Sequence, residues 1–213
     1  MPIANTGRLA IWNDCATDYQ AEFETWYQTE HLGERLSVPG FRRGRRYEAI
    51  DPHAGYFTYY ETDNPDVLTS STYLQRVNNP TLMTAHVMRE AFTDVSRTVC
   101  QATISIGSKR GAFATTLQLS RLPERDDLLK WAEAKSRVSL IARIEGWAAV
   151  DVIQSPSTEE QLRGGDGRIG ACLLVETLRE KVSRLVKEDL AEMFGVTGRR
   201  AASFRLLCKL AND

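Results

Sequence analysis

The sequence has few cysteines and almost no excess of charge of either sign. Its four cysteines, Cys15, Cys100, Cys172 and Cys208, lie far apart, form no C-x-x-C pair and have no spacing typical of a zinc site. Lysine and arginine number 27 against 28 aspartates and glutamates, which gives a net charge of -1. Nucleic-acid-binding proteins usually carry a basic excess. We therefore expect neither a nucleic-acid partner nor a structural metal.

Long apolar runs are also missing. No window approaches the roughly 20 apolar residues that a membrane span needs, and residues 1–8 lack the basic and apolar segments of a signal peptide. We expect a cytoplasmic protein with reduced thiols and no membrane partner. The 213 residues are 42% hydrophobic, which is enough for one large domain or two small ones with a real core.

Runs of apolar residues between turn signals predict the order βαββαβ in the first half. Thr17, followed three residues later by Gln20, predicts a capping box at the start of the first helix, and Pro39-Gly40 ends that helix. The predicted strands span residues 8–12, 41–50, 56–60 and 96–106, and the later helices span residues 64–77 and 81–92.

The second half repeats this order. The predicted strands span residues 114–119, 147–153, 169–175 and 203–210, and the helices span residues 124–141 and 180–194. Trp26 and Trp131 lie 105 positions apart, and Gly40 and Gly146 lie 106 apart, close to half the chain length. This spacing predicts an internal duplication, with one repeat over residues 1–108 and a degenerate one over residues 109–213.

The predicted fold class is α+β. A βαββαβ unit is typical of the ferredoxin-like arrangement, an antiparallel four-stranded sheet with helices on one face. The helix-free faces of two such sheets can cover each other and form a barrel. The sequence leaves open whether this barrel closes within one chain or between chains, and a homodimer is left open with it.

The first half carries a motif that resembles a known family. The motif consists of Phe23, Trp26, Tyr27, Glu30, His31, Glu34 and Arg35, followed by Pro39-Gly40-Phe41 and Arg45-Arg46-Tyr47. It is similar to that of the EthD-like members of the dimeric α+β barrel superfamily, although Gly33 stands where those proteins usually have proline. The resemblance covers about residues 6–106. Relatives include cofactor-free monooxygenases, lactone isomerases, polyketide cyclases and haem enzymes, so it implies a small-molecule enzyme without fixing the reaction.

His31 and Tyr27 are the candidate catalytic residues. An imidazole with a pKa near about 6.5 gives and takes protons at neutral pH, and the tyrosine hydroxyl could assist. Helical spacing places Phe23, Tyr27 and His31 on one side of their helix. The alternative is that His31 caps the helix C-terminus or fixes the Pro39-Gly40 turn. Lys135 and Ser136 fall where the second half would carry Glu30 and His31, which predicts one active site per chain.

The candidate substrate-binding residues are Trp26, Arg43, Arg45 and His86. Trp26 suits a pocket for a flat aromatic molecule, although aromatics at helical spacing more often belong to the core. The arginines at positions 42, 43, 45 and 46 alternate between two faces, and a guanidinium inside a barrel could hold a substrate carboxylate. Surface pairs with Glu34, Glu48 or Asp51 are the favoured interpretation. His86 is the most plausible axial ligand if haem is bound.

Gly165-Asp166-Gly167-Arg168-Ile169-Gly170 matches a dinucleotide-binding fingerprint by letter alone. That fingerprint needs a strand before it and a helix after it, whereas a polar loop over residues 155–164 is predicted here to precede it. We therefore interpret the segment as a mobile loop. Taken together, the patterns favour a small-molecule enzyme without a cofactor, acting on an aromatic, lactone or polyketide-like compound. The rival is a non-catalytic protein that binds a small ligand or acts through oligomerisation.

Overall fold

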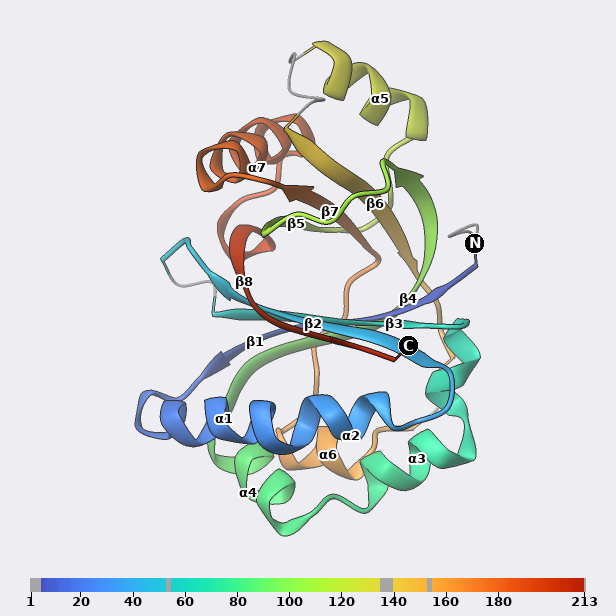
Figure 1. The fold of residues 1–213 in the computed structure, drawn as a ribbon, viewed down its shortest axis with the longest axis vertical. Helices are drawn as coiled ribbons and strands as arrows, with labels where there is room; N and C mark the ends of the chain where they lie inside the picture. Colours follow the sequence, from blue (N-terminus) through green and yellow to red (C-terminus); the bar gives the residue numbers. More distant parts are fainter. Residues whose placement is uncertain (1–4, 53–54, 135–139, 153–154, 213) are drawn as a thin grey trace.

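A computed structural model describes residues 5–52, 55–134, 140–152 and 155–212. Within this part, eight strands form one closed antiparallel barrel in the order β1-β3-β2-β8-β5-β7-β6-β4 (Figure 1). The strands are β1 (Gly7–Cys15), β2 (Phe41–Ala49), β3 (Tyr56–Thr62), β4 (Phe92–Ile106), β5 (Phe113–Leu119), β6 (Ile141–Ala149), β7 (Ala171–Thr177) and β8 (Ala201–Ala211). The predicted α+β class is confirmed.

The barrel closes within the chain. The strands of the first half lie in the order β4-β1-β3-β2, and those of the second half in the order β8-β5-β7-β6. The two sheets join where β2 pairs with β8 and where β4 pairs with β6, both antiparallel. This resolves the alternative that the sequence left open, while the duplication and the boundary at residues 108 and 109 stay predictions.

Helices cover the outside of both sheets (Figure 1). Over the first sheet lie α1 (Gln20–Trp26), α2 (Leu32–Leu36), α3 (Ser71–Asn78), α4 (Leu82–Glu90) and α6 (Thr158–Leu162), whereas α5 (Arg125–Ala134) and α7 (Glu180–Phe194) cover the second. Shorter turns are η1 (Thr17–Tyr19), η2 (Tyr27–His31), η3 (Pro65–Thr69) and η4 (Gly198–Arg200). No helix among the described residues is long and apolar enough to cross a membrane.

Apolar side chains fill both the barrel and the spaces beneath the helices. The barrel interior is aromatic and includes Trp12, Phe57 and Trp147, which are almost fully buried. On the first sheet, period-two alternation along β3 turns Tyr56 and Tyr60 toward the helices and Tyr59 into the barrel. Each strand of this sheet therefore presents one face to the barrel and the other to the helix layer.

Several predicted elements need correction. No side-chain cap forms at Thr17, because η1 starts there with Ala16 as its N-cap residue. The predicted helix over residues 64–77 is split at Ser70, whose backbone is extended and whose hydroxyl caps α3. The predicted helix over residues 124–141 ends too late, since Ile141 already begins β6. Residues 135 and 136 lie outside the described residues.

The largest departure from the sequence analysis concerns residues 155–170. The predicted loop over residues 155–164 contains α6, which starts after Ser157 because that hydroxyl accepts a hydrogen bond from the Glu160 N–H. Gly167 then forms a parallel bridge with β4, where its carbonyl accepts from the Arg97 N–H at 2.9 Å. The glycine-rich segment follows a helix and precedes β7, so it lacks the context of a dinucleotide site. This crossover carries second-half residues under the helices of the first half (Figure 1).

Candidate functional site

A small cavity of about 20 Å³ lies between the first sheet and its helices. Its walls combine apolar side chains with an unusual density of arginine. The lining residues are Leu9, Ile11, Tyr27, His31, Arg35, Tyr73, Met88, Phe92, Arg97, Glu159 and Arg163. A space of this size holds one water molecule or one small chemical group.

His31 and Tyr27 reach this cavity from the same π-helical turn, which runs from Tyr27 to His31. Such turns are rare and occur often at functional sites. Both side chains are buried, at 3% and 1% exposure, and Phe23 beside them is fully buried. The predicted shared side of the three residues is therefore confirmed. The Trp26 and His31 rings lie 4.1 Å apart between centroids, which fixes the imidazole against the helix.

The His31 imidazole is buried with one nitrogen unsatisfied. Its Nδ1 has no hydrogen-bond partner among the described residues. Burial lowers the pKa of His31 well below its ordinary value of 6.5, and the positive charges of Arg35, Arg163 and Arg46 lower the pKa further. The imidazole is therefore neutral at pH 7, and a neutral ring can accept a proton from a group in the cavity.

This low pKa predicts a specific loss of stability in mild acid. In the unfolded chain His31 takes up a proton below about pH 6.5, whereas in the folded protein it stays neutral, so acid favours unfolding. His31 should reduce the unfolding free energy by up to about 1.4 kcal/mol for each pH unit below 6.5. Urea titrations at pH 7.5 and pH 5.5 measure this, and the pH dependence should be smaller in a His31→Gln variant. An equal pH dependence in both proteins would contradict the prediction.

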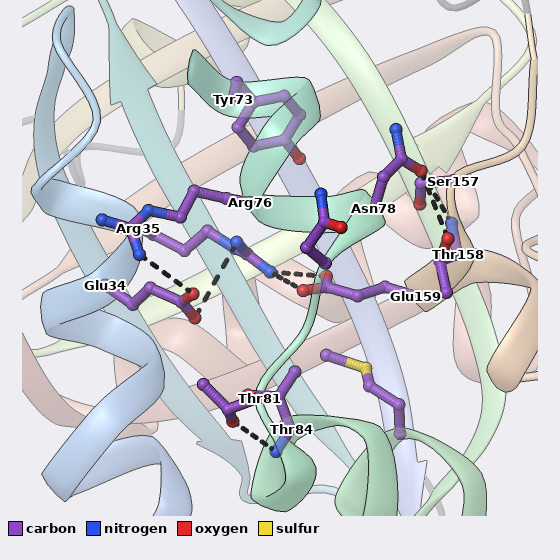
Figure 2. Close-up of polar contacts among 12 residues, drawn as sticks. Glu34, Arg35, Tyr73, Arg76, Asn78, Thr81, Thr84, Ser157, Thr158 and Glu159 are labelled. Atoms are coloured by element: carbon purple, nitrogen blue, oxygen red, sulfur yellow. Dashed lines mark hydrogen bonds and ion pairs between the residues drawn. The ribbon is translucent and has the colours of Figure 1, made fainter. Parts of the chain in front are cut away.

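A buried ion pair joins the two halves of the chain at this cavity. Arg35 from α2 donates two hydrogen bonds to Glu159 from α6, and both side chains are nearly inaccessible to solvent (Figure 2). Arg163, from the segment after α6, binds Asp166 with nitrogen–oxygen distances of 3.1 and 2.7 Å.

Sequence reasoning missed Glu159 and Arg163, because they lie in the segment predicted as a loop. Ser157, with Glu160 three residues on, is the helix-start signal that could have revealed α6.

A wider groove adjoins the small cavity. It has a volume of about 470 Å³ and shares Tyr73 and Arg97 with the cavity. The Arg97 Nη2 donates a hydrogen bond to the Tyr73 hydroxyl at 2.6 Å. These two side chains therefore stand between the outer groove, which is large enough for a small organic molecule, and the space next to His31.

Arg43 and Arg45 lie on the opposite face of the sheet from His31. Arg45 is buried inside the barrel, where its Nη1 lies 3.3 Å from a Glu176 oxygen and its Nη2 donates to the Gly111 carbonyl. Arg43 is half-buried and lies 3.5 Å from Glu61, its neighbour across β2 and β3. Both guanidinium groups therefore already face a protein carboxylate, away from the cavity.

The expectation of surface ion pairs for the arginine cluster is wrong for Arg45 and Arg46. Arg46 is fully buried on the helix face, where it pairs with Glu24 and lies over the Tyr27 ring, 4.3 Å from its centroid. The reason is that both faces of this strand are covered, one by the barrel interior and one by α1. Alternation separates the arginines as predicted, but neither face of β2 is open to water at these positions.

Trp26 and His86 fall at different depths. Trp26 is fully buried, and its indole N–H donates to the Thr84 hydroxyl at 3.0 Å, which ties α1 to α4. His86 lies on the outer side of α4 with its side chain 44% exposed, and its Nε2 is 3.3 Å from a Glu22 oxygen. The structure thus brings Tyr27, His31 and Trp26 together and leaves Arg43, Arg45 and His86 elsewhere.

Solved structures with the same fold cover nearly the whole chain. A candidate monooxygenase from Fusobacterium nucleatum aligns with a TM-score of 0.55 at 10% identity, over 98% of this chain and 95% of that one. An anthrone oxidase-like protein aligns with a TM-score of 0.56 at 8% identity, over 97% and 92%. A variant of chlorite dismutase from Candidatus Nitrospira defluvii aligns with a TM-score of 0.56 at 9% identity, over 96% and 92%.

These likenesses establish the fold, which is that of the dimeric α+β barrel proteins. At identities of 8–10% they establish nothing finer, so the resemblance to the EthD-like subfamily stays a prediction. No protein-family model matches the sequence, and no curated protein sequence matches it.

Proposed function

We propose that the protein is a small-molecule enzyme that transfers a proton at His31 without an organic cofactor. The observation that carries the proposal is the buried, neutral imidazole, whose Nδ1 lacks a partner among the described residues at the wall of an arginine-lined cavity. Removing a proton from a phenol, an enol or an acidic C–H leaves an anion. Arg35 and Arg163 at the same wall would stabilise that anion.

The small cavity accommodates one water-sized group, so the body of the substrate would lie in the outer groove. His31 would then accept a proton from the substrate, either directly or through one intervening water molecule. Both arrangements are normal for a general base. Tyr27, at the other end of the π-helical turn, would orient the reacting group. The names of two structural neighbours, a candidate monooxygenase and an anthrone oxidase-like protein, favour an aromatic or polyketide-like substrate.

A thermal-shift screen tests this proposal on the wild-type protein. The panel contains aromatic acids, enol lactones, quinols, anthrone and haem, each followed for conversion and, for the quinols and anthrone, for oxygen uptake. A ligand present at about 100 times its dissociation constant adds about 2.7 kcal/mol of stability, which raises the melting temperature by about 5–10 °C. We expect a shift and turnover with at least one aromatic or lactone compound. If no compound of the panel raises the melting temperature or is converted, the non-catalytic alternative is favoured.

A further inference from the structure

The outer groove has one apolar wall and two charged residues of opposite sign. The apolar part comes from η3, α3 and the segment before α6, and includes Leu68, Val77 and Pro156. Arg97 from β4 and Glu160 from α6 supply charges of opposite sign. A pocket of this kind, largely apolar with a few placed polar groups, is typical of a site for a small organic molecule.

Arg97 is the cation of this groove. Its Nη2 donates a hydrogen bond to the Tyr73 hydroxyl, and no aspartate or glutamate of the described residues forms an ion pair with it within 4.0 Å. By contrast, Arg35 and Arg163 next to it are each bound to a carboxylate. A guanidinium that has donors to spare at the edge of an apolar groove is suited to bind a ligand carboxylate.

Glu160 is the acceptor of this groove. It is 6% exposed, and its Oε2 is buried without a hydrogen-bond partner among the described residues. A buried acceptor left unpaired costs free energy, and a ligand hydroxyl in the groove would donate to it. Glu160 thus complements Arg97: Glu160 would accept a hydrogen bond from a ligand hydroxyl, and Arg97 would bind a ligand carboxylate.

From these two residues we propose that the groove binds a hydroxylated aromatic acid. Its carboxylate would bind Arg97, its ring would lie on the apolar wall, and its hydroxyl would donate to Glu160. The volume of about 470 Å³ fits a molecule of one or two rings. This inference names the substrate class of the proposed enzyme and rests on that proposed function, because the groove meets the cavity of His31 at Tyr73 and Arg97.

Three matched naphthalenes test the groove by isothermal titration calorimetry. They are 6-hydroxy-2-naphthoate, 2-naphthoate, which lacks the hydroxyl, and 2-naphthol, which lacks the carboxylate. The wild-type protein should bind the first most tightly. Loss of the carboxylate should weaken binding by about tenfold or more, since hydrogen bonds to a charged group have that magnitude. Equal affinity for all three compounds, or no binding of any, would overturn the proposal.

Substitutions then assign each effect to its residue. Arg97→Gln should weaken both acids by about tenfold or more and leave 2-naphthol unchanged, whereas Arg97→Lys, which keeps the charge, should retain most of the affinity. Glu160→Leu should weaken the two hydroxylated compounds only. The control is Arg168→Gln, since Arg168 is exposed and shares a neighbouring hollow with Arg97 but does not line the groove. Unchanged affinity in the Arg97→Gln protein would overturn the proposal.

The binding and conversion assays together separate this inference from the proposed function. If the naphthalenes fail to bind while another compound of the panel is converted in a His31-dependent way, the groove proposal is wrong and the proposed function stands. If they bind at Arg97 but no compound is converted, the groove proposal stands and the enzyme proposal fails.

Discussion

Replacing His31 by asparagine should lower the turnover number by about 10²–10⁴-fold on the compound that the wild-type protein converts. Asparagine keeps a polar side chain in the buried position but cannot accept a proton at neutral pH. The fold should survive, because the imidazole Nδ1 makes no hydrogen bond among the described residues that asparagine would have to replace. Steady-state kinetics of both proteins, with circular dichroism to verify the fold, measure the effect.

The same substitution at the other described histidine is the control. His86 is exposed on α4 and lies apart from the residues that line the cavity, so His86→Asn should leave turnover unchanged. Tyr27→Phe keeps the ring beside His31 and removes the hydroxyl alone, which tests the orienting role separately. Wild-type turnover should also persist as the pH falls through 6.5, since the pKa of His31 lies well below that value. A His31→Asn protein that retains wild-type turnover would disprove the catalytic role.

Local patterns predicted the part of this site that a single helix supplies. Phe23, Tyr27 and His31 share a side because their spacing is four residues, and helical geometry brings such residues together. The π-helical turn was not predictable, since one residue more per turn leaves the apolar spacing almost unchanged over so short a stretch.

Contacts between distant segments lie beyond such patterns. Arg45 and Arg46 read as exposed because arginine is mostly exposed in proteins, and their burial depends on Glu176 and Glu24, which the fold brings to them. Alternation along β2 still gave the correct division of these residues between two faces. The sequence pattern does not indicate that both faces of β2 are covered by other parts of the chain.

Glu159 is the clearest example of a contact between distant segments that sequence patterns do not predict. A five-residue helix in a polar segment carries too little periodicity to be distinguished from a loop. The carboxylate finds its partner, Arg35, 124 positions earlier in the chain. The half of the cavity wall that comes from the second half of the chain was therefore invisible to sequence reasoning, although it holds the only described carboxylate at that wall.

Replacing Glu159 by leucine should lower the unfolding free energy by about 3–5 kcal/mol, because it leaves the Arg35 guanidinium buried beside an apolar side chain. Glu34, 4.0 Å from Arg35, is too distant to replace the lost hydrogen bonds. The melting temperature of a chain of this size should fall by about 6–20 °C. The control is Glu188→Leu on the exposed side of α7, which should change stability by no more than about 0.5 kcal/mol.

The double variant Arg35→Met/Glu159→Leu should recover most of this loss, since an apolar pair of similar volume avoids the cost of burying two charges. It also separates the effect of the ion pair on the unfolding free energy from its effect on the pKa of His31. Arg35 is the charge that contributes most, after burial, to the low pKa of His31. The double variant should therefore be stable and lose less stability in mild acid than the wild-type protein. A double variant as unstable as Glu159→Leu would show that this ion pair itself holds the two halves together.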